Sequence, residues 1–292
     1  MGLKKHRRIR LIVQMAWTAF TNGYLYGFVS GKIYKGKTKK ICVPGLSCYS
    51  CPGALGSCPI GALQATLNAP EHKFAFYAMG VLILFGSILG RFVCGWLCPF
   101  GLVQDLLHKI PIFKKKKTLP GHKVLKWLKY PVLLVFVVIL PFTVVNASGM
   151  GQPWFCEYIC PSGTLLGGVP LVLLNEGLRT AIGARFLWKL GLLLLIVFTS
   201  IKIHRPFCKY LCPLGAFYGL FNPVALYRYQ LVSEKCTDCG ACKNICKAGI
   251  DPKLTPNSLE CIRCGDCLKV CSQDALVKVN LIQPGGEHAK NK

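Results

Sequence analysis

Four long stretches of the chain are almost entirely apolar. They cover residues 10–31, 74–93, 127–146 and 186–203. Each is close to the roughly 20 residues that an α-helix needs to cross a bilayer, although the first contains Thr18, Thr21 and Asn22. Two shorter apolar segments, 163–174 and 213–227, are interrupted by glycine and proline and are expected to be re-entrant or interfacial. The pattern predicts an α-helical membrane protein with about four transmembrane helices.

The composition also indicates that much of the chain lies in a lipid bilayer. Hydrophobic residues make up 52% of the 292 residues and charged residues 16%, whereas about a quarter of a soluble domain is charged. The formal charge is +25, and the basic residues cluster beside the apolar stretches, where anionic headgroups favour them. Lipid is therefore an expected partner and nucleic acid is not. The first stretch lacks a clear A-x-A cleavage site, so we expect a retained helix there.

The lysines and arginines also predict an orientation. Five basic residues stand at or before the start of the first stretch, the fifth being Arg10, and seven lysines lie between the second and third, within residues 109–126. The loop between the third and fourth stretches holds only Arg179 and Arg185. The positive-inside rule then places both termini and the 94–126 loop on the cytoplasmic side of a prokaryotic cytoplasmic membrane. The lysines between Lys32 and Lys40 disagree, because this orientation puts them outside.

A short motif, Cys-Pro-x-Gly, occurs once after each apolar stretch. The four copies begin at Cys58, Cys98, Cys160 and Cys212. Three copies have a cysteine four residues upstream, and the first copy has two more distant ones: Cys94, Cys156, Cys208, and Cys48 with Cys51. The segments 91–101 and 205–215 match closely, so residues 1–228 are predicted to be a tandem repeat of a two-helix unit.

The predicted topology divides these cysteines between two faces of the membrane. We call Cys94, Cys98, Cys208 and Cys212 the inner set, and Cys48, Cys51, Cys58, Cys156 and Cys160 the outer set. Two halves related by pseudo-symmetry would bring two pairs together on each face, and a cubane iron–sulfur cluster needs four thiolates. One or two further clusters are therefore predicted here. Disulfides, zinc sites and buried free thiols stay open as alternatives. Cys42, outside the repeat, is expected to be an ordinary thiol.

The strongest signal lies near the C-terminus, where two cysteine runs share one spacing. They are Cys236-x2-Cys239-x2-Cys242-x3-Cys246 and Cys261-x2-Cys264-x2-Cys267-x3-Cys271. In bacterial two-cluster ferredoxins the fourth cysteine of each run ligates the other cluster. One 4Fe-4S cluster is thus predicted on Cys236, Cys239, Cys242 and Cys271, and a second on Cys261, Cys264, Cys267 and Cys246. Residues 229–281 would form this α+β ferredoxin domain and residues 282–292 a flexible tail.

Other cofactors find little support in the sequence. There is no C-x-x-C-H haem motif, and none of the six histidines lies in the middle of an apolar stretch. Intramembrane carboxylates are missing, so no proton relay is predicted. Asp105 and Glu157, beside the cysteine motifs, are expected to be solvated or capping residues. No catalytic residue is assigned.

In the motifs at Cys94–Pro99 and Cys208–Pro213, together with the twin C-terminal runs, the chain resembles the NapH/NosR/MauN group of membrane polyferredoxins. The likeness extends from about residue 74 onward. It implies anaerobic or microaerobic respiration, with electrons passing between the quinone pool, or a cytoplasmic ferredoxin or dehydrogenase, and a partner redox protein. The stretches 48–61 and 156–161 go beyond the minimal pattern of that group. They favour extra membrane redox sites that exchange electrons with an extracytoplasmic flavoprotein or reductase.

Three functions are compatible with these observations. The favoured one is an electron relay, in which the chain is an electron-transfer subunit rather than a stand-alone enzyme. The second is a quinol dehydrogenase or a reductase of an external metal ion such as copper. The third is a non-catalytic role in redox sensing or in assembly of a partner oxidoreductase.

Overall fold

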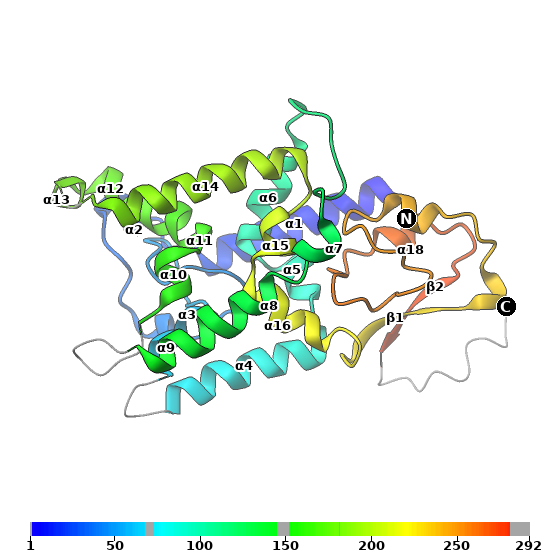
Figure 1. Cartoon of the computed structure of the whole chain (residues 1–292), viewed down its shortest axis with the longest axis horizontal. Coiled ribbons are helices and arrows are strands. Elements are labelled where there is room, and N and C mark those ends of the chain that lie inside the picture. Colours follow the sequence, from blue (N-terminus) through cyan, green and yellow to red (C-terminus); the bar gives the residue numbers. More distant parts are fainter. Residues whose placement is uncertain (1, 68–72, 145–151, 181, 281–292) are drawn as a thin grey trace.

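The computed structural model describes residues 2–67, 73–144, 152–180 and 182–280. The predicted tail at 282–292 and the end of the predicted stretch 127–146 lie outside the described residues. Four long helical segments run roughly along the long axis, and a small domain that carries both strands caps one end (Figure 1). The long segments are α1 (Leu3–Thr21), α4 (Lys73–Leu89), the continuous helix His122–Thr143 and α14 (Ala184–Lys202).

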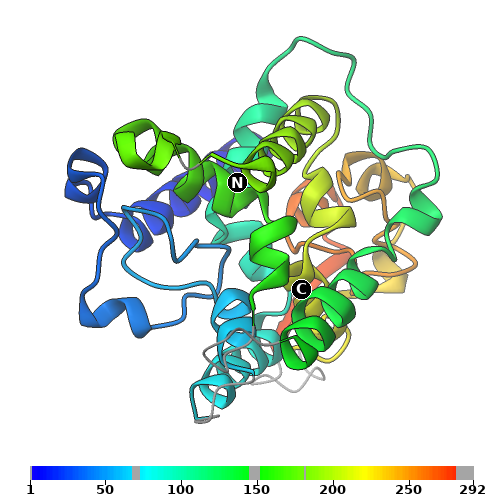
Figure 2. The ribbon, with the colours of Figure 1, turned by 60° about the vertical axis from the view of Figure 1, so that its left-hand side comes forward.

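Shorter helices connect the long ones. They are α2 (Tyr26–Ser30), α3 (Pro59–Thr66), α5 (Phe92–Trp96), α6 (Pro99–Lys109), α10 (Trp154–Tyr158), α11 (Pro161–Gly163), α12 (Val169–Leu174), α13 (Glu176–Thr180), α15 (Pro206–Tyr210) and α16 (Pro213–Phe221). The helix His122–Thr143 comprises α7 (His122–Leu125), α8 (Lys129–Pro131), a π-helical part at Val132–Ile139 and α9 (Leu140–Thr143). Figure 2 brings forward the end with α2 and α13, where the segment between α2 and α3 forms a long loop that contains a short 3₁₀ helix at Lys37–Lys40.

Two of the four predicted spans are long and apolar enough, among the described residues, to cross a membrane. These are His122–Thr143 and Ala184–Lys202, and most of their surface is exposed. Among the described residues the apolar part of α4 is shorter, Phe76–Leu89, and the helix ends before Gly90, whose φ is 52°. The predicted span 10–31 is not one helix: α1 begins seven residues earlier, at Leu3, and ends at Thr21.

The first helix differs from the prediction because of how it packs. Its buried face consists of His6, Arg10, Gln14 and Thr21, which recur at intervals of one or two helical turns. Its exposed side includes Phe20, 72% exposed. The average hydropathy of a stretch does not report this arrangement, in which the polar side chains face the protein and the apolar ones face outward.

The C-terminal domain is a small α+β unit. Strand β1 (Tyr227–Leu231) pairs antiparallel with β2 (Leu276–Asn280), so the domain begins two residues before the predicted boundary at 229. Between the strands lie α17 (Ala241–Ile245) and α18 (Asp266–Val270). Both helices follow a glycine in the left-handed region, Gly240 and Gly265, which residues with a Cβ rarely adopt. The two cysteine runs thereby wrap around the ends of these helices.

Candidate functional site

Each Cys-Pro-x-Gly motif begins a helix. Cys58, Cys98, Cys160 and Cys212 are the N-cap residues of α3, α6, α11 and α16, with extended backbone and proline at the first helical position. Proline suits that position because its missing N–H would be unpaired there. The Cys212 Sγ accepts the backbone N–H of Gly215 at 3.3 Å, and the glycine of each other copy donates likewise. The motif thus holds a sulfur at the positive end of a helix.

The inner set converges in the protein core. Cys94, Cys98, Cys208 and Cys212 are each at most 4% exposed. Burial raises the pKa of all four thiols, and the charge of at least one other thiol of the set raises each pKa further. A buried amide, Gln104, donates to the Cys208 Sγ at 3.2 Å. These four sulfurs therefore share one environment, with two coming from each half of the repeat.

Two arginines cross between the halves over the inner set. Arg91, from the first half, donates to the carbonyl oxygen of Cys208 at 3.0 Å. Arg205, from the second half, donates to the carbonyl oxygen of Cys94. A Cβ added at Gly101 would lie 3.2 Å from the guanidinium of Arg205, and the equivalent glycine of the second half meets Arg91 at the same distance. The motif glycines thus leave room for the arginine of the opposite half.

Each crossing arginine has a buried carboxylate partner. Glu260, from the ferredoxin domain, lies 3.1 Å from Arg91 and 2.5 Å from the Lys129 Nζ. Asp105 accepts from Arg205 at 2.6 and 2.8 Å. Burial alone would raise the pKa of Asp105, but Arg205 and His204 hold that pKa well below its usual value. The prediction that Asp105 is solvated is therefore wrong, because this carboxylate neutralises a buried arginine.

Four of the five outer cysteines line a cavity of about 1120 Å³. The thiols that line it are Cys48, Cys58, Cys156 and Cys160. Burial raises the pKa of all four. The Lys189 Nζ donates to the carbonyl oxygen of Cys156 at 3.0 Å, and the buried Lys39 donates to that of Ala54 at 2.8 Å. Positive charge thus accompanies the outer set too.

The structure separates one of the five outer cysteines from the others. A Cβ added at Gly61 would lie 3.5 Å from the Cys156 Sγ, and one added at Gly163 would lie 3.5 Å from the Cys48 Sγ. The matching distances make Cys48 the counterpart of Cys156 in the repeat, although Cys48 lies ten residues before its Cys-Pro motif. Cys51 does not line the cavity. Cys51 is therefore not one of the four cysteines that could hold a cluster in this cavity.

Sequence reasoning missed two glutamines that serve the two sets. Gln64 donates to the Cys156 Sγ at 3.5 Å, as Gln104 does to Cys208. Both are fully buried, and each stands six residues after the Cys-Pro cysteine of the first half, while its sulfur acceptor belongs to the second half. This common offset is the signal that could have identified them.

A short segment joins the inner and outer sets. The backbone N–H of Leu46 donates to the Cys98 Sγ of the inner set. The Leu46 carbonyl oxygen accepts from the Ser162 hydroxyl at 3.3 Å, and Leu46 also lines the outer cavity. Beside it, the fully buried Tyr218 donates to the Pro44 carbonyl oxygen at 3.2 Å. Few atoms therefore separate the two sets.

The inner set also contacts the ferredoxin domain directly. Gly95 lies against the Ile262 carbonyl oxygen so closely that an added Cβ would overlap it. The Trp96 Nε1 donates to the carbonyl oxygen of Arg263 at 3.1 Å. These contacts place the segment after Cys94 on the loop between Cys261 and Cys264, which belong to one predicted ferredoxin cluster.

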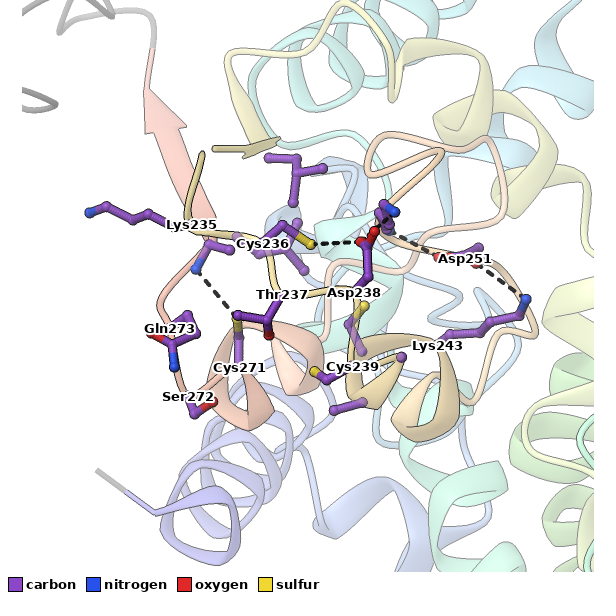
Figure 3. Close-up of a pocket in the computed structure, with 17 residues that line it drawn as sticks. Lys235, Cys236, Thr237, Asp238, Cys239, Lys243, Asp251, Cys271, Ser272 and Gln273 are labelled. Carbon is purple, nitrogen blue, oxygen red and sulfur yellow. Dashed lines mark hydrogen bonds and ion pairs between the residues drawn. The ribbon is translucent and has the colours of Figure 1, made fainter. Parts of the chain in front are cut away.

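Both predicted ferredoxin sets are brought together as well. A cavity of about 260 Å³ is lined by the first: Cys236, Cys239, Cys242 and Cys271 (Figure 3). The second set, Cys246, Cys261, Cys264 and Cys267, is linked by electrostatic interactions between its thiols. Cys239 is exposed whereas Cys267 is buried. The first set is therefore the more exposed one, and the second lies on the side of the domain that contacts the helical part.

The sulfur geometry fits clusters better than the alternatives. None of the 18 cysteines is in a disulfide. Over the described ranges, no three histidine, cysteine or acidic side chains converge closely enough to hold a single metal ion. Four thiols spread around one buried space, with backbone N–H groups aimed at them, suit a larger inorganic core. Cys42 stands apart, with its Sγ 3.8 Å from the Ser57 hydroxyl.

Comparison with known proteins agrees with this chemistry. A family model described as a 4Fe-4S binding domain matches residues 71–120, 130–173 and 184–227. Uncharacterized protein MJ0750 of Methanocaldococcus jannaschii is 32% identical over 67% of this chain and 75% of its own length. Ferredoxin-type protein NapH of Haemophilus influenzae is 28% identical over 66% of this chain and 64% of its own. The methylamine utilization ferredoxin-type protein MauN of Methylorubrum extorquens is 29% identical over 71% of this chain and 67% of its own length.

The chain belongs to the NapH/NosR/MauN-type polyferredoxins. Regulatory protein NosR of Stutzerimonas stutzeri is 27% identical, over 22% of its own length. No solved structure matches this polyferredoxin. Each of the three segments matched by the 4Fe-4S model contains one Cys-x3-Cys-Pro motif. The polyferredoxin is thus a ferredoxin-type 4Fe-4S electron-transfer protein.

Proposed function

We propose that this polyferredoxin relays electrons across a prokaryotic cytoplasmic membrane through four 4Fe-4S clusters. The observation that carries the proposal is the connected series of four cysteine sets. The exposed ferredoxin set lies beside the buried ferredoxin set in one domain. Gly95 joins the buried ferredoxin set to the inner set, and Leu46 joins the inner set to the outer set. Each cluster supplies a one-electron redox centre when bound.

The long helices support a location in the membrane. Their outward side chains are large and apolar, such as Leu84 of α4, Leu134 of the helix His122–Thr143 and Leu194 of α14, each at least 55% exposed. A soluble monomer rarely exposes contiguous apolar surface on this scale. We propose that all four long helices span the bilayer, with the ferredoxin domain and both termini in the cytoplasm.

The protein residues tune and protect the redox centres. Arg91 and Arg205 place positive charge beside the inner set, and Lys39 and Lys189 do so beside the outer set. Positive charge and N–H donors favour the more negative, reduced form of a cluster and so raise its potential. Burial of the inner set, whose thiols are at most 4% exposed, keeps water from its sulfurs. The chain thereby supplies ligands, charge and insulation.

The two ends of the series define the expected partners. On the cytoplasmic side, the exposed Cys239 marks where a ferredoxin or a dehydrogenase would exchange electrons. At the outer end, an extracytoplasmic flavoprotein or reductase would take that role. The outer cavity favours a second candidate function, that of a quinol dehydrogenase or metal-ion reductase subunit in anaerobic respiration. Its volume of about 1120 Å³ is large enough to hold a small molecule, since ligand pockets usually measure roughly 300–1,000 Å³.

Iron and acid-labile sulfide, measured on anaerobically purified protein, test the relay. Four cubanes give about 16 of each per chain, and the ferredoxin domain alone gives about 8. Cys98→Ser and Cys160→Ser should each remove one membrane cluster and leave the ferredoxin signals unchanged. A value of about 8 in the wild type would reject the membrane clusters. Reduction of the clusters by added quinol would favour the second candidate function.

A further inference from the structure

A separate cavity of about 290 Å³ lies between α1, α6 and the residue that follows Cys246. Its walls carry five side chains that are cationic at neutral pH, and a single carboxylate, that of Asp105. The cations are Arg7, Arg8, Arg10, Lys109 and Lys247. None of these residues belongs to a cysteine set, and the relay does not use the cavity.

Most of this positive charge has no partner within the protein. Asp105 is already held by Arg205 at 2.6 Å and lies 3.6 Å from Arg10. Arg7 pairs with Asp266 at 2.9 Å. That leaves Arg8, Lys109 and Lys247, none of which has an ion pair among the described residues. A cavity that gathers uncompensated cations attracts an anion.

A buried amide points to hydrogen bonding as well as charge. Gln14 lines the same cavity and is 1% exposed. Neither its Nε2 nor its Oε1 has a hydrogen-bond partner in the described part of the chain. An unpaired buried amide is costly, and its N–H would pair with the oxygen of an anion bound among the cations.

The position of the cavity indicates the source of the anion. Leu11 lines it, and on the outer side of the same helix Ile12 and Met15 are 52% and 44% exposed. Leu106 of α6 is 45% exposed. The cavity thus lies where basic surface gives way to apolar surface, which is the level of lipid headgroups in a membrane protein.

We propose that this cavity binds a phosphate group, namely that of an acidic phospholipid on the cytoplasmic side. The lipid source rests on the membrane location proposed above. The cations on the cavity wall hold the phosphate oxygens, the Gln14 amide donates to one of them, and the acyl chains lie along the exposed face of α1.

Binding of fluorescently labelled phosphatidylglycerol in mixed micelles tests the site, with labelled phosphatidylcholine as the neutral comparison. The double variant Arg8→Gln with Lys247→Gln should weaken phosphatidylglycerol binding by about tenfold or more. Its matched control is Lys114→Gln with Lys123→Gln, which removes the same charge from exposed positions elsewhere on the cytoplasmic loop. Gln14→Leu should weaken binding without lowering the unfolding temperature.

Several outcomes are decisive. Equal binding of the two lipids by the wild type, or equal losses in the double variant and its control, would overturn the site. Displacement of the label by inorganic phosphate at a concentration similar to that of the lipid would keep the phosphate site and reject lipid as its source. Displacement only by a large excess of phosphate, or no displacement, supports the lipid. Iron content of the same samples separates this proposal from the relay. Full iron without lipid preference rejects the site alone, and low iron with lipid preference rejects the relay alone.

Discussion

The buried Glu260 offers a direct test of how the ferredoxin domain is attached. Its two partners, Arg91 and Lys129, are 1% and 0% exposed, so Glu260→Gln leaves two buried cations without their counter-charge. Breaking a buried ion pair from one side typically costs about 3–5 kcal/mol, because the remaining charge stays unpaired. The glutamine keeps one acceptor oxygen for these cations, so the cost should lie at the lower end of this range. We therefore expect a loss of about 3 kcal/mol in docking stability.

Denaturant unfolding, followed at the visible absorbance of the clusters, would measure this loss. Limited proteolysis of the connection at 222–226 would report release of the domain. Glu234→Gln is the matched control, because Glu234 is exposed in the turn Ser233–Lys235. Adding Lys129→Met to the Glu260 variant should recover part of the stability. If Glu260→Gln and Glu234→Gln differ by less than about 1 kcal/mol, the ion pairs do not hold the domain and the reasoning fails.

Three further predictions concern the redox centres. Cys48→Ser should remove the outer cluster while Cys51→Ser retains it, as iron analysis and electron paramagnetic resonance would show; the opposite pattern would refute the assignment. Gln104→Leu removes an N–H donor to a sulfur, so the potential of the inner cluster alone should fall in a redox titration. Gly95→Ala should slow electron transfer from the ferredoxin domain in rapid-mixing experiments, whereas Gly80→Ala, which meets open space, should not.

Most of what could be predicted about the cysteine sets came from the spacing of the cysteines in the sequence. The run from Cys236 to Cys246 and its partner specify ligand sets because the loop length between ligands fixes how the chain wraps a cluster. The Cys-Pro-x-Gly repeat likewise predicted which cysteines meet, since equivalent residues occupy equivalent places. The spacing of Cys48 departs from the repeat, so its equivalence to Cys156 became visible only through the glycine contacts.

The features that escaped prediction depend on tertiary contacts. Arg91 and Arg205 stand at matching places in the repeat, but the sequence does not show that each reaches the opposite half. Asp105 looked solvated because its partner lies 100 residues away. The first span was misplaced because hydropathy averages over a helix and does not register that Gln14 and Arg10 face the protein.

The crossed arginines carry a consequence for the origin of the protein. Each of the two centres takes two cysteines from each half, and the inner centre also has one arginine neighbour from each half. An ancestor consisting of a single half would therefore complete either centre only by pairing with a second copy. The two halves of the present chain are not identical. They diverged where the ferredoxin domain docks, since Gly95 admits the Ile262 backbone while its counterpart, Lys209, donates at 2.8 Å to the carbonyl oxygen of Lys247. A single ferredoxin domain docked on two related halves is an arrangement that a symmetric homodimer of one half could not produce.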